Sequence, residues 1–273
     1  MFSTLAITAA LSAAAWAGPL APLRVAALHE VGTSPPGTTA CKPADAVCRL
    51  EGWVRVAADG GATLVVSPEY ALDLDIPATI PPLGSVPPEG SVLRRFSDLS
   101  DSLDLYLVMA IQTAGPNLPR NSQLAFGPDG TLLAIHHKIE LFDAERGFMQ
   151  AGTSVTTFPT PHGPVGMLIC ADLYGNPALH RELTEDLGAV LIAVSAQWTV
   201  TGALSWPAAW AHDWSTAIVF ANGSGGSGRG SGVFDPTGAP RATSQSPQSG
   251  VVFADLQLGP VARPHKPPTP SGG

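Results

Sequence analysis

The stretch GPVGMLICADLYGNP, residues 163–177, joins an apolar run to a cysteine and then to polar, turn-forming residues. Residues 165–169 are apolar and partly β-branched, which predicts a short buried strand. Cys170 comes directly after this strand. In open α/β sheets, ligands and reactive groups gather at the carboxyl ends of strands, so Cys170 is a candidate nucleophile. The alternative interpretation is a buried cysteine that serves as a small hydrophobic side chain.

A helix and a second strand are predicted to follow this cysteine. Asn176 and Pro177 have the residue types of an N-cap and a first helical position, which predicts a helix over residues 178–187. Residues 189–196, AVLIAVSA, form a second apolar run. The resulting order of strand, helix and strand is typical of the α/β class.

The rest of the chain continues this alternation. Strands are predicted over residues 23–29, 62–67, 105–112, 122–126, 131–136, 232–234 and 250–256. Helices are predicted over residues 45–58 and 91–103, where apolar residues recur at helical spacing. The proline-rich residues 72–90 predict a long surface loop at the border of a pocket. Together these elements predict an α/β fold with a mixed sheet.

Tryptophans mark two positions after the second apolar run. Trp206, Trp210 and Trp214 recur every four residues, which predicts a helix with one aromatic stripe. We expect this stripe to pack in the core or at a subunit interface rather than to form a substrate platform. Trp198 follows the strand at residues 189–196, whose end is predicted to lie beside that of the Cys170 strand. We therefore expect Trp198 to line a pocket.

The composition is that of a large globular domain with few charges. The chain has 273 residues, of which 45% are hydrophobic and 13% charged, which suits one domain with a substantial core, or at most two. The formal net charge is −8, and no run of Lys or Arg occurs. We therefore expect neither nucleic acid nor an anionic membrane as a partner. Beyond the N-terminal segment, no apolar stretch reaches the roughly 18 residues of a membrane-spanning helix.

The two ends of the chain differ from the middle. Residues 1–17 carry no charge, are rich in Ala and Leu, and end in small residues around a tryptophan. This pattern predicts a secretory signal peptide and a secreted or periplasmic protein; the alternative is an ordinary apolar N-terminal segment. Residues 263–273 are proline-rich and predict a disordered tail. The folded domain is expected over residues 18–262.

The three cysteines form an odd set for an exported protein. Cys41 and Cys48 lie seven residues apart, near the start of a predicted helix, at a separation that suits a small disulfide loop. Cys170 is then left without a partner. An unpaired thiol in an oxidising compartment favours a chemical role for Cys170.

Three predicted strand ends carry three different reactive groups. Glu69 follows the strand at residues 62–67, Lys138 follows the second arm of a hairpin, and Cys170 follows the strand described first. Acyl transfer through a thioester needs a base for the thiol proton, a cation for the oxyanion, and the attacking sulfur. The three residues supply these three functions.

Three motifs around these residues resemble a known family. PEY at residues 68–70, HHKIELFDAERGF at residues 136–148 and GMLICADLYGNP at residues 166–177 are similar in order and separation to motifs of the nitrilase superfamily. These are the carbon-nitrogen hydrolases with a Glu, Lys and Cys triad, and the resemblance runs from Leu23 to about Leu256. The segments HKIELF, SAQW and FANGSGGSGRGSGVF are most similar to the biotinidase and vanin (pantetheinase) branch. Members of that branch carry an additional carboxyl-terminal domain, which we do not expect here.

The resemblance implies a role for each site residue. It implies that Glu69 is the general base and acid, Lys138 the cation at the oxyanion, and Cys170 the nucleophile. Glu145 falls where many members have a second glutamate that positions the substrate and the triad lysine. The backbone N–H of Ala171 is implied as a second oxyanion donor. The implied fold is a four-layer αββα sandwich with mixed sheets, paired through its helical face into a homodimer.

The function expected from these observations is that of an exported amidase. It would hydrolyse a linear, non-peptide carbon-nitrogen bond of a small-molecule amide through a thioester on Cys170. One alternative is an acyltransferase that uses the same thioester. Another is a small-molecule binding protein that has kept the fold and lost turnover.

Two further patterns have residue types found in cofactor sites. His136 and His137 are adjacent on a predicted strand, so their side chains point to opposite faces, and no third ligand has suitable spacing for a metal. The glycine-rich residues 223–228 match a dinucleotide fingerprint, but no helix is predicted after them. We therefore expect neither a metal nor another cofactor.

Overall fold

The computed structural model of the chain describes residues 21–37, 41–42, 44–72, 77–200, 202–223 and 230–258. The segments for which a signal peptide and a disordered tail are predicted, residues 1–17 and 263–273, lie outside the described residues. Most of the glycine-rich segment at residues 223–228, which matches a dinucleotide fingerprint, also lies outside them.

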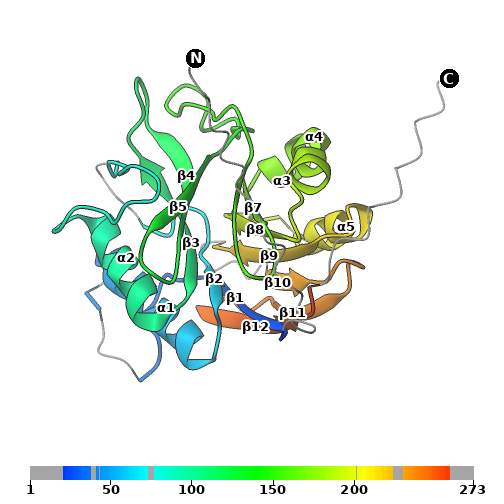
Figure 1. Cartoon of the computed structure of the whole chain (residues 1–273), viewed down its shortest axis with the longest axis horizontal. Coiled ribbons are helices and arrows are strands. Elements are labelled where there is room, and N and C mark those ends of the chain that lie inside the picture. Colours follow the sequence, from blue (N-terminus) through cyan, green and yellow to red (C-terminus); the bar gives the residue numbers. More distant parts are fainter. Residues whose placement is uncertain are drawn as a thin grey trace, which may run out of the picture.

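Two six-stranded mixed sheets form the centre of the described chain (Figure 1). The first sheet has the strand order β12 (Gly250–Leu256), β1 (Leu23–His29), β2 (Leu64–Val66), β3 (Tyr106–Thr113), β4 (Arg120–Phe126) and β5 (Leu132–His137). The second has the order β6 (Thr156–Phe158), β7 (Val165–Ile169), β8 (Leu191–Ala196), β9 (Ala217–Asn222), β10 (Ser231–Phe234) and β11 (Pro240–Ser244). In each sheet the second, third and fourth strands are parallel to one another, and the other neighbours are antiparallel. Each sheet therefore has a parallel centre.

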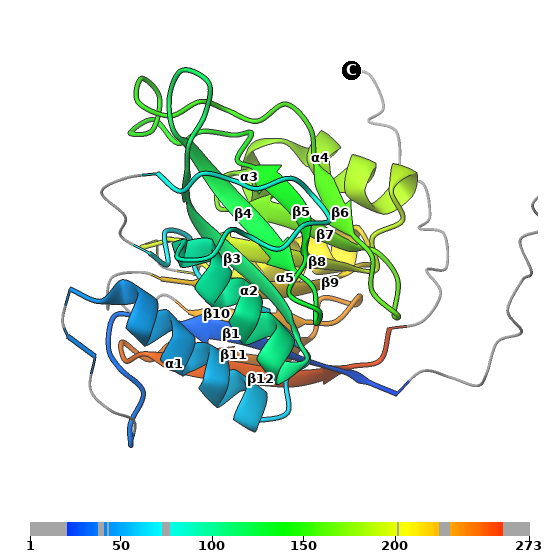
Figure 2. The same ribbon diagram turned by 60° about the vertical axis from the view of Figure 1, so that its left-hand side comes forward.

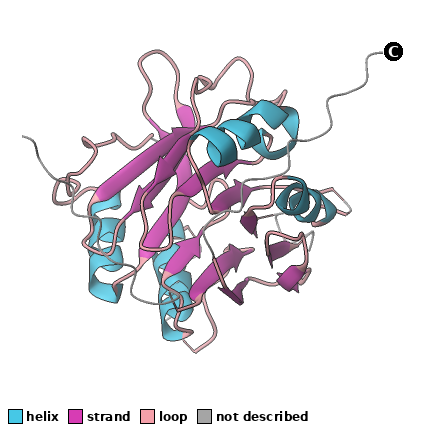
Figure 3. Cartoon of the chain, turned by 45° about the vertical axis from the view of Figure 1, so that its right-hand side comes forward, coloured by secondary structure: helices cyan, strands magenta, loops and turns pink. Residues whose placement is uncertain are grey.

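Helices cover the outer face of each sheet. Helices α1 (Ala46–Asp59) and α2 (Val92–Leu103) lie on the first sheet (Figure 2). The second sheet is covered by α3 (Asp172–Gly175), α4 (Pro177–Arg181), the π-helical turn η1 (Glu182–Asp186) and α5 (Ser205–Asp213) (Figure 3). The order of helix, sheet, sheet and helix confirms the predicted four-layer αββα sandwich.

Apolar side chains fill the three interfaces between the four layers. Val66 and Val108 of the first sheet belong to the cluster that also holds Met167 of the second. Phe96 of α2 packs in the cluster beneath the first pair of helices, and Phe220 in the cluster beneath α3 to α5. Because the central strands are covered on both faces, their sequences are largely apolar, which helps to account for the low fraction of charged residues.

The two long helices follow the sequence pattern closely. Asp45 caps α1 by accepting a hydrogen bond from the Cys48 N–H at 2.9 Å, and Ser91 caps α2 by accepting one from the Arg94 N–H at 3.1 Å. Side-chain caps of this kind satisfy N–H groups that have no partner within the helix. Both helices accordingly begin within one residue of their predicted start.

The helix predicted over residues 178–187 is present as α4 and the π-helical turn η1, which together run from Pro177 to Asp186. The short helix α3, which begins two residues after Cys170, was not predicted, and the extended backbone of Asn176 separates it from α4. Asn176 does act as an N-cap, since its side chain accepts a hydrogen bond from the Ala178 N–H at 3.0 Å. Further on, the Thr184 hydroxyl of the π-helical turn donates to the His180 carbonyl of α4, a contact that disturbs regular helix pairing.

Two edge strands were not predicted. Strand β6 has only three residues, and β11 is mostly exposed and lacks the alternation of apolar and polar residues. Both lie at an edge of the second sheet, where backbone pairing rather than side-chain burial defines the strand. A sequence pattern based on burial has little signal there.

A disulfide joins Cys41 to Cys48, with 5.8 Å between their Cα atoms, and Cys170 is a free, buried cysteine. The described part of residues 72–90 forms no helix or strand beyond a single bridge between Ala78 and Thr113. Each helix among the described residues is too short or too polar to cross a membrane.

Candidate active site

Glu69, Lys138 and Cys170 meet at the floor of one cavity. Lys138 directly follows β5, Cys170 directly follows β7, and Glu69 follows β2 by three residues. All three side chains are buried, and all three line a cavity of about 680 Å³. The structure thus brings together the three reactive groups that the sequence places on separate strand ends.

Lys138 lies between two carboxylates. Its Nζ is 2.7 Å from Glu69 Oε1 and 2.7 Å from Glu145 Oε2. Burial alone would lower the pKa of Lys138, but the nearby Glu69 and Cys170 and the hydrogen bonds to both carboxylates raise it above its ordinary value. Lys138 is therefore a fixed cation at the cavity floor.

Glu145 is held by donors on both oxygens. Its Oε1 accepts hydrogen bonds from the Tyr70 hydroxyl at 2.6 Å and from Asn121 Nδ2 at 3.0 Å. Its Oε2 accepts the Phe142 N–H at 2.8 Å and also contacts Lys138. Burial tends to raise the pKa of Glu145, but the hydrogen bonds from Lys138 and Tyr70 outweigh it and lower the pKa. Glu145 is thus an anion with a complete set of partners.

Glu69 has a different environment. The hydrogen bonds that it accepts from nitrogen atoms, from Lys138 and Asn121, are both 2.7 Å long and both end on Oε1. Burial raises the pKa of Glu69, and the opposing effect of Lys138 does not restore it to the ordinary value of 4.5. Cys170 is among the neighbours that influence the pKa of this carboxylate, and both side chains line the same cavity. Glu69 is therefore placed to exchange a proton with the thiol.

The backbone turns sharply at Cys170. This residue has a φ of 49°, in the left-handed region, and its N–H donates to the Ser195 carbonyl at 2.8 Å. A non-glycine residue in this region costs about 1–3 kcal/mol, and such strain is concentrated at functional sites. Burial and then the charge of Glu69 raise the pKa of the Cys170 thiol, against the effect of Lys138. The resting sulfur is therefore protonated.

Two hydrogen-bond donors lie close to Cys170. The indole Nε1 of Trp198 donates a hydrogen bond to Cys170 Sγ at 3.1 Å, and Trp198 lines the cavity. The Ala171 N–H, next to the sulfur-bearing residue, donates to no acceptor among the described residues. The Trp198 donor is therefore engaged by the sulfur, whereas the Ala171 N–H is a donor in the turn that directly follows Cys170.

Asn121 is a site residue that the sequence reasoning missed. It lies on β4, is fully buried, and its amide nitrogen bridges Glu69 and Glu145. Its backbone carbonyl also accepts the Lys138 N–H at 2.9 Å. In the observed register Ser122 pairs with His137, so Asn121 lies opposite Lys138. A register shift between Ala125 and Phe126 sets this pairing, whereas a simple count outward from the turn at residues 127–130 would place Asn121 opposite His136, so the sequence offers no signal that identifies Asn121.

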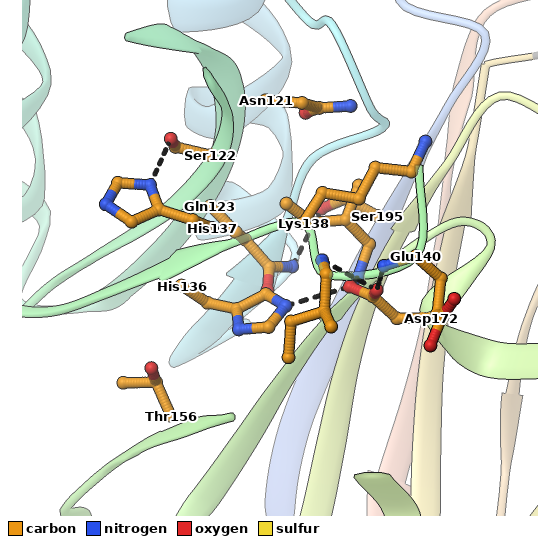
Figure 4. A network of polar contacts seen from close by, with 12 residues as sticks. Asn121, Ser122, Gln123, His136, His137, Lys138, Glu140, Thr156, Asp172 and Ser195 are labelled. Atoms are coloured by element: carbon orange, nitrogen blue, oxygen red, sulfur yellow. Dashed lines mark hydrogen bonds and ion pairs between the residues drawn. The ribbon is translucent and has the colours of Figure 1, made fainter. Parts of the chain in front are cut away.

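A buried carboxylate behind the site joins its two main segments (Figure 4). Asp172 Oδ1 accepts the N–H groups of Ile139 and Glu140, at 3.0 and 2.7 Å. Its Oδ2 accepts the Ile169 N–H at 3.0 Å and contacts His136 Nε2 at 2.9 Å. Asp172 therefore ties the segment after Lys138 to the turn that carries Cys170, and it too was missed by the sequence reasoning.

The two adjacent histidines do point to different surroundings. His136 is buried against Asp172, whereas His137 Nδ1 lies 2.7 Å from the Ser122 hydroxyl (Figure 4). Burial and then the charge of Arg120 lower the pKa of His137 to about 4. In the described part of the chain, no group of three His, Cys, Asp or Glu side chains is arranged to hold a metal ion.

One expectation about the cavity walls is wrong for Trp206, and another finds no support among the described residues. Trp210 packs against the core beneath α3 to α5, but Trp206, on the same predicted stripe, is 48% exposed and lines the cavity. Helix α5 places the Trp206 and Trp210 rings against different neighbours, which their four-residue spacing in the sequence does not show. None of the described residues between 72 and 90 lines the cavity, whose outer walls come instead from α3, α5 and the segments after β5 and β8.

Comparisons with known proteins agree with this geometry. The family model described as carbon-nitrogen hydrolase matches residues 25–264. The omega-amidase NIT2 of Homo sapiens is 32% identical over 145 residues, which cover 47% of this chain and 50% of the relative. The pantetheinase of Homo sapiens is 29% identical over 181 residues, or 55% of this chain and 35% of the relative. The chain thus matches about half the length, or less, of these curated relatives.

Solved structures extend the likeness to the whole fold. Saccharomyces cerevisiae Nit3, described as a member of branch 10 of the nitrilase superfamily, superposes with a TM-score of 0.72 at 21% identity over 88% of this chain and 91% of that chain. An amidase from Nesterenkonia sp. superposes with a TM-score of 0.68 at 20% identity over 87% of this chain and 91% of that chain. The match of the family model over most of the chain, together with this shared fold, shows that the chain belongs to the carbon-nitrogen hydrolases of the nitrilase superfamily.

Proposed function

We propose that this carbon-nitrogen hydrolase is an amidase that cleaves a small, non-peptide amide through a thioester on Cys170. The observation that carries the proposal is the cluster of Glu69, Lys138 and Cys170 at the floor of one cavity. In this proposal Glu69 is the general base and acid, and Cys170 is the nucleophile. Lys138 and the Ala171 N–H stabilise the oxyanion.

The first half of the reaction forms the thioester. Glu69 takes the proton of the Cys170 thiol as the sulfur attacks the amide carbonyl carbon. The negative charge that develops on the carbonyl oxygen is stabilised by Lys138 and the Ala171 N–H, each worth about 3–4 kcal/mol in comparable sites. The carbon-nitrogen bond then breaks, and Glu69 returns its proton to the departing amine.

The second half releases the acid. Water enters the place of the amine, Glu69 accepts one of its protons, and the resulting oxygen nucleophile attacks the thioester carbon. The carbon-sulfur bond breaks, and the proton on Glu69 returns to the sulfur. The pKa values support this cycle, because burial raises those of both Glu69 and Cys170, so a single proton can pass between them.

The relatives support an amide as the substrate. Two of them are named omega-amidase and pantetheinase. One structure of a mutant of the Nesterenkonia amidase, in which a glutamate is replaced by leucine, is described as showing covalent addition of the acetamide moiety of fluoroacetamide at the active site cysteine. By analogy, we infer that an acyl group, or a trapping reagent, becomes attached to the sulfur of Cys170.

Release of ammonia or amine from a panel of amides tests the proposal. The panel contains acetamide, hexanamide, a pantetheine amide and a biotin amide, and Cys170→Ala is the control. Turnover that disappears in the control supports the amidase function, whereas equal release by both proteins would exclude it. Intact-mass analysis after treatment with fluoroacetamide should show an adduct that Cys170→Ser lacks, and absence of the adduct would favour a binding protein. Products formed with added hydroxylamine separate hydrolysis from acyl transfer.

We further propose that the protein is exported. The charge-free residues 1–17 support this, as does the disulfide between Cys41 and Cys48, since disulfides persist in oxidising compartments. N-terminal sequencing of protein expressed with its natural leader tests the proposal. A mature chain that begins near Gly18 outside the cytoplasm is expected, and an uncleaved protein inside the cell would contradict it.

A further inference from the structure

Exposed apolar side chains gather at the mouth of the cavity. Of the nine large apolar side chains that are most exposed in the described part of the chain, five line this cavity. We call these five the rim: Phe142 (55% exposed), Phe148 (51%), Tyr174 (39%), Val200 (55%) and Trp206 (48%). Contiguous apolar surface of this kind on a soluble domain marks a place where another molecule binds.

The rim is continuous with the nucleophile. The Trp198 indole contacts Cys170 Sγ at 3.1 Å. Its ring centroid lies 5.4 Å from that of Tyr174, whose ring lies 5.9 Å from that of Trp206. An aromatic wall therefore runs from the sulfur to the exposed edge of the cavity, and a molecule bound to the sulfur would pass along it.

Among the described residues that line the cavity, no cation is left over to pair with an anionic substrate. The described residues that line the cavity contribute Lys138 as their cation, and its ammonium is already held by Glu69 and Glu145. The two carboxylates would repel a further carboxylate placed beside them. A neutral group is thus favoured against the wall.

The proposed reaction places the acyl half and the amine half of an amide on different sides of the cavity. The acyl group becomes bonded to the sulfur, which Trp198 contacts, whereas the amine must remain within reach of Glu69 to receive its proton. The apolar wall therefore faces the acyl half. Resting on the amidase function proposed above, we propose that the preferred substrates are neutral amides with a large apolar acyl group, alkyl or arylalkyl, that lies against the wall and the rim.

Two amide series test the inference. In the first, the acyl group grows from acetamide through butyramide and hexanamide to 3-phenylpropanamide; in the second, the acyl group stays acetyl and the N-alkyl group grows. We expect kcat/KM to rise about two- to fourfold for each methylene added to the acyl group, and to change little along the N-alkyl series. Adipamate, a carboxylate of similar length to hexanamide, should be a poorer substrate than hexanamide.

Variants of rim residues test whether the rim causes the dependence of kcat/KM on acyl length. Trp206→Ala and Phe148→Ala should lower kcat/KM for hexanamide about tenfold and leave acetamide within about twofold, as expected from lost apolar contact area. Leu83→Ala is the matched control, since Leu83 is 59% exposed and does not line the cavity. Equal losses on acetamide and hexanamide would overturn the inference, as would a preference for adipamate or a rise along the N-alkyl series.

Three further outcomes distinguish a failure of the amidase function from a failure of the inference. If no amide of either series is hydrolysed and Cys170→Ala behaves identically, the amidase function itself fails and the inference fails with it. If acetamide is hydrolysed but chain length has no effect, only the inference fails. If Trp206→Ala changes the mass in analytical ultracentrifugation without altering the chain-length preference, the rim is a contact between copies of the chain, which also overturns the inference.

Discussion

Two regions of the molecule bring a carboxylate onto the same ammonium group. Glu69 comes from the end of β2 and Glu145 from the segment after β5, and each lies 2.7 Å from Lys138 Nζ. Yet the pKa of Glu69 is raised and that of Glu145 is lowered. Proximity to the cation therefore does not decide which carboxylate can carry a proton.

The difference lies in the remaining donors. Glu145 accepts further hydrogen bonds from Tyr70, Asn121 and the Phe142 N–H, which satisfy both of its oxygens. Glu69 accepts its hydrogen bonds from nitrogen on one oxygen and is more deeply buried. Environments that push two pKa values apart identify the proton carrier and the fixed ion. We infer that Glu69 moves a proton, while Glu145 holds Lys138 in place.

Replacing the proton carrier should have the largest effect. Glu69→Gln keeps the shape of the side chain but removes the base, so kcat on the best amide should fall about 10³-fold, within the usual range for general acid-base catalysis. Steady-state kinetics measures the loss, and thermal unfolding confirms that the variant is folded. A variant that kept a tenth of the activity would show that another group carries the proton.

Replacing the fixed ion should cost less. Glu145→Gln retains one acceptor oxygen and loses the charge that holds Lys138, so kcat/KM should fall about 30-fold, the value of a hydrogen bond to a charged group at about 2 kcal/mol. The same kinetic assay checks this, with Glu140→Gln as a control on a side chain that does not line the cavity. A loss equal to that of Glu69→Gln would remove the proposed distinction between the two carboxylates.

Much of the fold could be predicted because it depends on local pattern. Strands β1, β7 and β12 were predicted to the residue, since each is an apolar run between clear turn signals. The helix over residues 178–187 was predicted to within one residue at each end, whereas the short helix α3 was not predicted, because four residues are too few to show a helical period. Local propensity alone does not reveal so short a helix.

The residues of the site were easier to predict than their environments. Glu69, Lys138 and Cys170 stand out as reactive groups at strand ends and within motifs. Asn121 does not, because its role depends on the register of a hairpin and on a carboxylate 52 residues away. The contrast between Glu69 and Glu145 likewise depends on contacts across the fold, such as that of the Tyr70 hydroxyl, 75 residues from Glu145 in sequence.

The pH dependence of Glu145→Gln sharpens the comparison further. Glu69 must be ionised to accept the thiol proton, so kcat/KM falls as the pH drops through the pKa of Glu69. The charge of Glu145 is one of the causes that raise this pKa. Removing that charge lowers the pKa of Glu69, so the acid limb of the kcat/KM profile should move to lower pH. A limb that stayed in place or moved to higher pH would mean that the two carboxylates do not interact as described.

The smallest effect is expected at Tyr70, which reaches the site through Glu145. Tyr70→Phe removes the hydroxyl that donates to Glu145 Oε1 at 2.6 Å and leaves the other donors in place. The loss of one of several hydrogen bonds should lower kcat/KM about fivefold, corresponding to about 1 kcal/mol. Since Tyr70 also lines the cavity, a double-mutant cycle is needed to separate the two roles. If Tyr70 acts only through Glu145, Tyr70→Phe should add nothing in the Glu145→Gln background, whereas additive losses would mean that the hydroxyl contacts the substrate directly.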